Sequence, residues 1–74
     1  MGKRELLVSR HAAERILSLG LNIDDIEKVI NEGERIPEGK TKTRYRLKTK
    51  KGLLIAICSE YPGQTLVITV TKRK

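Results

Sequence analysis

One histidine and a few basic and hydroxyl side chains are the residues of this sequence best suited to chemistry. His11 is the only histidine, and histidine is the side chain that most readily exchanges a proton near neutral pH. Arg46 and Lys48 could hold a phosphate group, and Thr69 or Tyr45 could add a hydrogen bond. Together they meet the needs of RNA cleavage by 2′-hydroxyl attack, which requires a base, an acid and a stabilised phosphate but no metal ion. The alternative is that His11 only packs or hydrogen-bonds at the start of a helix.

Basic residues alternate with other residues along residues 41–50. A β-strand repeats every two residues, so a strand here would turn all its basic side chains to one face at intervals of roughly 6.6 Å. The net charge of +7 also favours a polyanionic partner: nucleic acid, the ribosome, an anionic membrane or an acidic protein. A solvated, lysine-rich surface is the alternative. We predict that the following residues bind nucleic acid: Lys42, Arg44, Arg46, Lys48 and Lys50.

Several classes of protein are disfavoured by what the sequence contains. One histidine and one cysteine, Cys58, do not make a zinc site, so no metal or other cofactor is expected. There is no glycine-rich phosphate loop and no nucleophile motif. The start of the chain, residues 1–4, is basic and is followed by only three apolar residues, 6–8, so we expect neither a signal peptide nor a membrane span. A single cysteine agrees with a cytoplasmic location.

Two helices are predicted from their capping residues. Ser9 can cap a helix over residues 10–19, and Asn22 can cap a second over residues 23–32 with Asp25 completing a capping box. Glycines follow both helices. The apolar stripe of the first helix consists of Ala12, Ala13, Ile16, Leu17 and Leu19.

The hairpin after the basic strand has two alternative registers. A three-residue loop, residues 50–52, pairs Thr49 with Leu53 and turns Leu53, Ile55 and Ile57 toward the core. A two-residue loop, residues 51–52, would instead place Ile55 and Ile57 on the face of Arg46 and Lys48. Because bulky aliphatic side chains favour the core, we predict the longer loop.

The last strand completes a shallow trough on the basic face. A four-residue loop, residues 60–63, pairs Ile57 with Leu66 in the last strand. The trough would have basic side chains on one side, Ala56 at its bottom and Thr69 on the other side. Its surface could then hold a phosphate chain.

These elements predict a single α+β domain over residues 1–74. Two N-terminal helices would pack on one face of a three- to four-stranded antiparallel sheet. Residues 34–36 would form a short edge strand. Residues 6–8 would form either a first strand or an apolar contact ahead of the first helix.

Three stretches of the chain, residues 9–15, 30–36 and 66–70, resemble a family of small uncharacterised microbial domains. The shared pattern is a His-Ala-x-x-Arg helix, a second helix that ends in glycine, and a last strand with a threonine between hydrophobic residues. The resemblance covers nearly the whole chain. This family has been likened to the fold of barnase-type nucleases, tRNA-cleaving colicins and ribosome-dependent messenger-RNA interferase toxins.

The resemblance implies the fold of these nucleases and toxins. It also implies a metal-independent endoribonuclease or toxin-like function. His11 matches the first-helix histidine, Arg15 the arginine that follows it, and Thr69 the last-strand threonine. Arg15 is therefore a further nucleic-acid-binding candidate, whereas Arg46 lies in the trough by position and not by motif. The last strand lacks an aromatic residue that some related nucleases use near the site.

The expected partner is RNA or the ribosome, and a toxin would also have an acidic, antitoxin-like protein partner. The alternative function is a non-catalytic module that binds nucleic acid or a protein through the same surface. Loss of RNA cleavage on substitution of His11 would distinguish the enzyme from the binding module.

Overall fold

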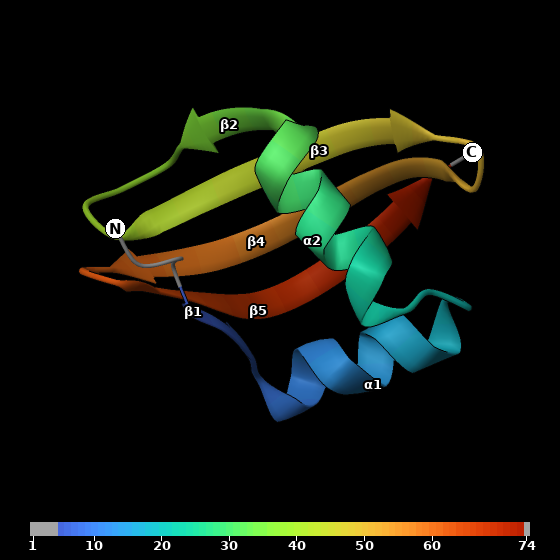
Figure 1. Ribbon diagram of the computed structural model, residues 1–74, viewed down its shortest axis with the longest axis horizontal. Coiled ribbons are helices and arrows are strands. Elements are labelled where there is room, and N and C mark those ends of the chain that lie inside the picture. Colours follow the sequence, from blue (N-terminus) through green and yellow to red (C-terminus); the bar gives the residue numbers. More distant parts are fainter. Residues whose placement is uncertain (1–4, 74) are drawn as a thin grey trace.

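Two helices pack on one face of a five-stranded sheet in the computed structural model, which describes residues 5–73 (Figure 1). The strands lie in the order β1-β5-β4-β3-β2, with β1 parallel to β5 and the other neighbours antiparallel. The predicted α+β class is confirmed. The sheet has five strands rather than three or four because β1 joins β5 at one edge and β2 joins β3 at the other. In chain order the elements are β1 (Glu5–Val8), α1 (Arg10–Ser18), α2 (Ile23–Glu32), β2 (Glu34–Pro37), β3 (Lys42–Thr49), β4 (Gly52–Tyr61) and β5 (Gln64–Arg73).

Both helices begin at the residues that the sequence predicts. The Ser9 hydroxyl oxygen accepts a hydrogen bond from the backbone N–H of Ala12 at 3.1 Å. Asn22 and Asp25 form the capping box, in which each side chain accepts from the other residue's backbone N–H at 3.0 Å. These caps satisfy donors that the first turn of a helix leaves unpaired.

The buried side of α1 is narrower than the apolar stripe predicted from the sequence. Ala12 and Ile16 are buried, whereas Ala13 is exposed and Leu17 is 79% exposed. In Figure 1, α1 lies beside β5 near the edge of the sheet, whereas α2 crosses the face over β3 and β4. A helix near an edge meets the sheet along one side only, so the outer part of the stripe stays in solvent.

The hydrophobic core lies between the helices and the covered face of the sheet. Ile26 and Val29 of α2 are fully buried, as are Ala56 and Cys58 of β4. The small side chains on β4 leave room for the aliphatic side chains of α2. The other buried members of this core are Ala12, Ile16, Leu21, Tyr45, Leu54, Val67 and Val70.

The register between β3 and β4 differs from the predicted one. A two-residue turn, residues 50–51, pairs Thr49 with Gly52 and not with Leu53. Gly52 has a φ of +125°, and a Cβ there would lie 2.5 Å from the carbonyl oxygen of Arg73, so this position requires glycine. Because successive side chains point to opposite faces, the change exchanges the two faces of β4. Leu54, Ala56 and Cys58 therefore face the core, and Leu53, Ile55 and Ile57 face away from it.

The turn between β4 and β5 is also shorter than predicted. Residues 62–63 form a two-residue turn, and Tyr61 pairs with Gln64. Gly63 has a φ of +76°, which the second central position of a type II turn requires, and the proline before it suits the first position. The predicted four-residue loop is therefore wrong.

A β-bulge in β5 shifts its register once more. The ladder passes from Val67 to Thr69 and leaves Ile68 without a strand partner. Ile57 pairs with Thr69, so the predicted pairing of Ile57 with Leu66 is wrong. Val67 before the bulge and Val70 after it are both buried. The extra residue thus keeps apolar side chains against the helices on both sides of the bulge.

Gly33 lies where the end of α2 meets β3. A Cβ at this position would lie 2.3 Å from the carbonyl oxygen of Val29 and 2.6 Å from that of Arg46. We expect Gly33→Ala to lower the free energy of unfolding by about 2 kcal/mol, because backbone atoms must move to make room. Gly39→Ala is the control, since its Cβ would meet nothing closer than the Lys42 Cβ at 3.9 Å. Denaturant unfolding checks this, and equal stability of the two variants would contradict it.

Candidate nucleic-acid interface

The sheet face turned away from the helices carries three consecutive rows of paired residues across β3, β4 and β5. Directly paired residues point their side chains to the same face. Each row has a basic residue on β3, an aliphatic residue on β4, and a threonine or arginine on β5. We call this surface the open face, and its rows are Arg44–Ile57–Thr69, Arg46–Ile55–Thr71 and Lys48–Leu53–Arg73.

The open face corrects the predicted trough. Ala56 is fully buried beneath the helices and cannot form the bottom of a trough on this side. Half-buried Ile55 and Ile57 occupy that place, because the β3–β4 register differs from the predicted one. Thr69 does lie on the predicted side, in the row of Arg44. The basic, aliphatic and hydroxyl groups therefore occupy three parallel lines along the sheet.

The predicted basic residues of β3 share one face, as the alternation indicates. Lys42 pairs with Ser59 and continues the line of Arg44 and Arg46 toward the start of the strand. Lys42, Arg46 and Lys48 are exposed, and Lys50 is exposed in the turn that follows. The prediction of a basic line on one face of the strand is thus confirmed by the pairing.

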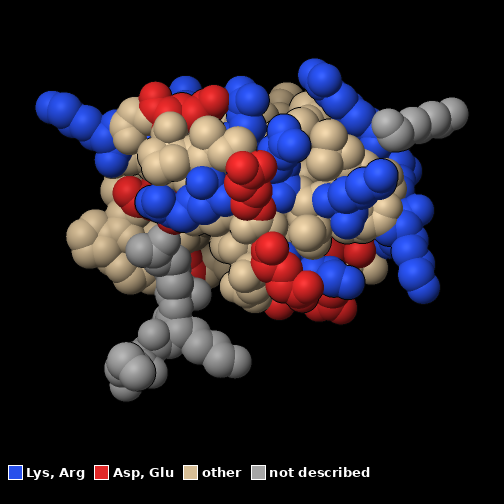
Figure 2. All heavy atoms as spheres, turned by 90° about the horizontal axis from the view of Figure 1, so that it is seen from above, with Lys and Arg blue, Asp and Glu red and all other residues tan. Residues whose placement is uncertain are grey.

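Two of these arginines are engaged by carboxylates that the sequence analysis did not consider. Arg46 Nε lies 3.2 Å from Glu34 Oε1, and Arg44 Nη2 lies 2.9 Å from Glu38 Oε2. Figure 2 looks onto the β2 edge of the sheet and shows acidic side chains interspersed among basic ones. The pairing of Glu34 with Arg46 across β2 and β3 could have indicated the first of these contacts, had the register of β2 been known.

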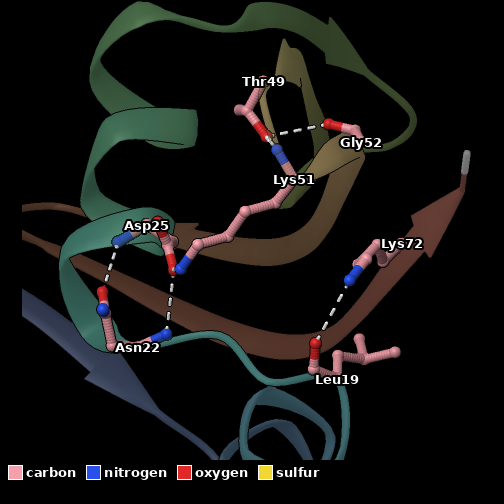
Figure 3. A network of polar contacts seen from close by, with 7 residues as sticks. All are labelled: Leu19, Asn22, Asp25, Thr49, Lys51, Gly52 and Lys72. Atoms are coloured by element: carbon pink, nitrogen blue, oxygen red, sulfur yellow. Dashed lines mark hydrogen bonds and ion pairs between the residues drawn. The ribbon is translucent and has the colours of Figure 1, made fainter.

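Other lysines at the turn end of the sheet reach toward the helices instead. Lys51 Nζ lies 2.8 Å from Asp25 Oδ2, and Lys72 Nζ donates to the carbonyl oxygen of Leu19 at 3.5 Å (Figure 3). The hydrogen bond from Lys51 lowers the pKa of Asp25. These two lysines therefore help to join the sheet to the helices and do not belong to the open face.

The start of α1 is tied to the backbone of β5 beside Thr69. The Ser9 backbone N–H donates to Val67 and its hydroxyl donates to the carbonyl oxygen of Ile68, both at 3.0 Å. His11 follows two residues later and is exposed. Among residues 5–73 no hydrogen bond links His11 to Thr69. The fold thus brings the histidine-bearing end of the helix to the β5 side of the sheet.

Arg15, a candidate from the family resemblance, has a structural contact. Its Nε donates to the carbonyl oxygen of Val70 at 3.3 Å. β1 pairs only with residues 64–67 of β5, so this carbonyl lies on the part of the β5 edge that β1 does not cover. Arg15 therefore satisfies a backbone acceptor at the edge, and only its remaining guanidinium nitrogens are left for another partner.

A buried carboxylate network links three strands, and the sequence analysis missed it. The Glu60 side chain is only 10% exposed. Its Oε1 accepts hydrogen bonds from Arg35 at 2.7 Å and from the Thr43 hydroxyl at 2.6 Å, and its Oε2 accepts from the Tyr45 hydroxyl. Burial alone would raise the pKa of this carboxyl, but the hydrogen bonds from Thr43, Tyr45 and Arg35 outweigh burial and lower it to about 2.

The network leaves Glu60 ionised and weakly basic at neutral pH. Burial, together with the hydrogen bond to Glu60, raises the pKa of Tyr45, so its hydroxyl stays protonated and donates. Tyr45 is thus buried on the covered face and is no hydrogen-bond donor to a ligand on the open face. We interpret the network as a structural tie between β2, β3 and β4.

The described part of the chain contains neither a metal-binding cluster of side chains nor a membrane-spanning helix. Within residues 5–73, no three His, Cys, Asp or Glu side chains gather where they could hold a metal ion. Cys58 is buried, and burial raises the pKa of its thiol to about 12. Over the same residues, neither helix has the length and apolar character needed to cross a lipid bilayer.

The fold and this surface together define a small α+β domain with an uncovered, basic sheet face. Comparisons with protein-family models, with curated proteins and with solved structures find no match to the chain. The family resemblance therefore stays a prediction, and arguments about function depend on the geometry of the open face.

Proposed function

We propose that this domain binds RNA through the open face of its sheet. The observation that supports the proposal is the repetition of a basic residue in three consecutive rows. Such a line presents positive charge at intervals of roughly 6.6 Å, which suits a polymer with a charge on every unit. We place this function in the cytoplasm, with RNA or the ribosome as the partner.

The other groups of the open face have roles in the same proposal. In the described residues no carboxylate pairs with Lys42, Lys48 or Arg73, so these cations are available to phosphates. The aliphatic line on β4 offers an apolar surface to riboses and bases. The hydroxyls of Thr69 and Thr71 can hydrogen-bond to phosphate oxygens or to 2′-hydroxyl groups.

Binding of a labelled, short single-stranded RNA, followed by fluorescence anisotropy, tests the proposal. We expect saturable binding that weakens steeply as salt rises, because phosphate contacts release counterions. Polyglutamate of similar length serves as the control for an acidic protein partner. Absence of RNA binding at low salt would contradict the proposal, and tighter binding of polyglutamate would favour a protein-interaction module.

A second candidate function is metal-independent cleavage of the bound RNA, as in a toxin-like endoribonuclease. The observation that favours it is the hydrogen bond from the Ser9 hydroxyl to the carbonyl oxygen of Ile68, the residue before Thr69, which ties the start of α1 to the backbone of β5. In this scheme His11 transfers the proton, Arg46 stabilises the phosphate, and Thr69 donates a hydrogen bond. An acidic, antitoxin-like protein would then compete with RNA for the open face.

Cleavage is tested separately from binding. We expect the wild-type protein to cleave RNA in the presence of a metal chelator, and His11→Ala to lose at least about 100-fold in rate, the contribution typical of a general acid or base. The same variant should keep its RNA affinity. If the wild-type protein cleaves neither free nor ribosome-bound RNA, the endoribonuclease proposal is wrong, while the binding proposal stands.

A further inference from the structure

The two central arginines of the open face differ from the lysines beside them. Arg46 is paired with Glu34 and Arg44 with Glu38, at 3.2 and 2.9 Å. Lys48, the next basic residue of β3, has no such partner in the part of the chain that the structure describes. An arriving phosphate therefore meets an unpaired lysine, but at each arginine it competes with a carboxylate.

The sheet fixes the positions of both carboxylates. Glu34 is the ladder partner of Arg46, so the two side chains lie on the same face of adjacent strands. The backbone N–H of Glu38 donates to the carbonyl oxygen of Lys42 at 2.9 Å, which holds this residue beside the start of β3. The two carboxylates thus belong to the built geometry of the open face.

Both ion pairs are exposed enough to be exchanged. The side chains of Arg46 and Glu34 are 51% and 63% exposed, and ion pairs of this kind are weak in water. In the Arg44–Glu38 pair the carboxylate contacts a terminal nitrogen, while Arg44 Nε is buried and has no acceptor within the described residues. The present pairing therefore leaves the Arg44 guanidinium incompletely satisfied.

We propose that Glu34 and Glu38 are specificity-determining residues, which act as internal competitors for the arginines and so select phosphate polymers over isolated phosphates. This inference rests on the proposed RNA-binding function of the open face. When a single phosphate binds one arginine, it gains one contact, but the arginine loses its contact with the carboxylate. The displaced carboxylate also repels the phosphate. A polymer is held by the unpaired lysines and can bind without displacing either carboxylate, whereas an isolated phosphate at an arginine bears the full cost of the displacement.

The test compares Glu34→Gln and Glu38→Gln with Glu27→Gln as a matched control. Glu27 is exposed on α2, in the helix layer, so its substitution changes the net charge equally but leaves the open face intact. We expect each open-face variant to bind a short single-stranded RNA about threefold more tightly, the size expected for release of an exposed ion pair. The slope of log K against log salt should steepen by up to about 0.7 for each released arginine.

Selectivity is the more specific result. The affinity for uridine monophosphate should rise by a larger factor than the affinity for RNA in both open-face variants, so that discrimination between polymer and monomer falls. Equal effects of all three substitutions on both ligands would overturn the inference and leave RNA binding intact. If no protein of the set, the wild type included, binds RNA, the proposed function itself fails.

Discussion

Reversal of the charge of Lys48 is expected to weaken RNA binding about tenfold, because one phosphate contact is lost and a repulsive charge replaces it. Lys48 is the best probe of the open face, since it is exposed and forms no ion pair within the described residues. The salt dependence of Lys48→Glu should also weaken by about 0.7 in the slope of log K against log salt. Anisotropy titrations at several salt concentrations measure both quantities.

Lys28→Glu is the matched control for this prediction. Lys28 is exposed on α2, so its reversal changes the net charge by the same amount on the opposite layer of the molecule. We expect only a small loss of affinity, from the long-range field of the protein. Equal losses in the two variants would show that net charge alone governs binding, and the open face would then have no special role.

Glu60→Gln is expected to lower the free energy of unfolding at neutral pH by about 2 kcal/mol, a large part of the stability of a domain of this size. The substitution keeps the shape of the side chain but removes the charge that holds Thr43, Tyr45 and Arg35 together. Glu27→Gln, which removes an exposed carboxylate, should have almost no effect. Similar stability of these two variants would contradict a structural role for the network.

The effect of Glu60 should depend on pH in a defined direction. Its pKa in the folded protein is about 2, below the ordinary value of 4.5. The stabilisation is therefore fully present above the ordinary value and is lost as the pH falls through the folded-state value. Urea unfolding from pH 7 to pH 2 should show the wild type approaching the stability of Glu60→Gln. A constant difference between the two over this range would contradict the assignment.

The helices could be predicted because their signals are local. Ser9 and Asn22 cap their helices through contacts within three residues along the chain, so the sequence alone identifies them. The basic line on β3 was equally clear, since alternation of residue types directly determines the side-chain faces of a strand. Fold class and one side of the open face followed from these two local patterns.

The register of β4 could not be predicted, because its residues 53–58 are apolar on both faces. An apolar run without alternation does not distinguish the two faces, and our preference for bulky residues in the core was wrong. The core beneath α2 instead takes small Ala56 and Cys58, since Ile26 and Val29 of the helix fill the space. The bulge at Ile68 has no local signal either.

The polar contacts between side chains on different strands depend on how the strands pair. The ion pair of Glu34 with Arg46 requires the β2–β3 register, and the Glu60 network requires three strands to align. Sequence spacing between these residues carries no information about such contacts. The candidate residues were therefore predictable as a line of charge, whereas their partners were not.

Methyl NMR spectra during addition of a short single-stranded RNA test the central proposal most directly. The proposal predicts saturable shifts of the methyl signals of Ile55 and Ile57, which lie on the open face between the basic and threonine lines. The signals of Leu54, which points into the core from the same strand, and of Ile23, which is exposed on α2, should stay in place. Shifts at Ile23 with none at Ile55 and Ile57 would contradict the account.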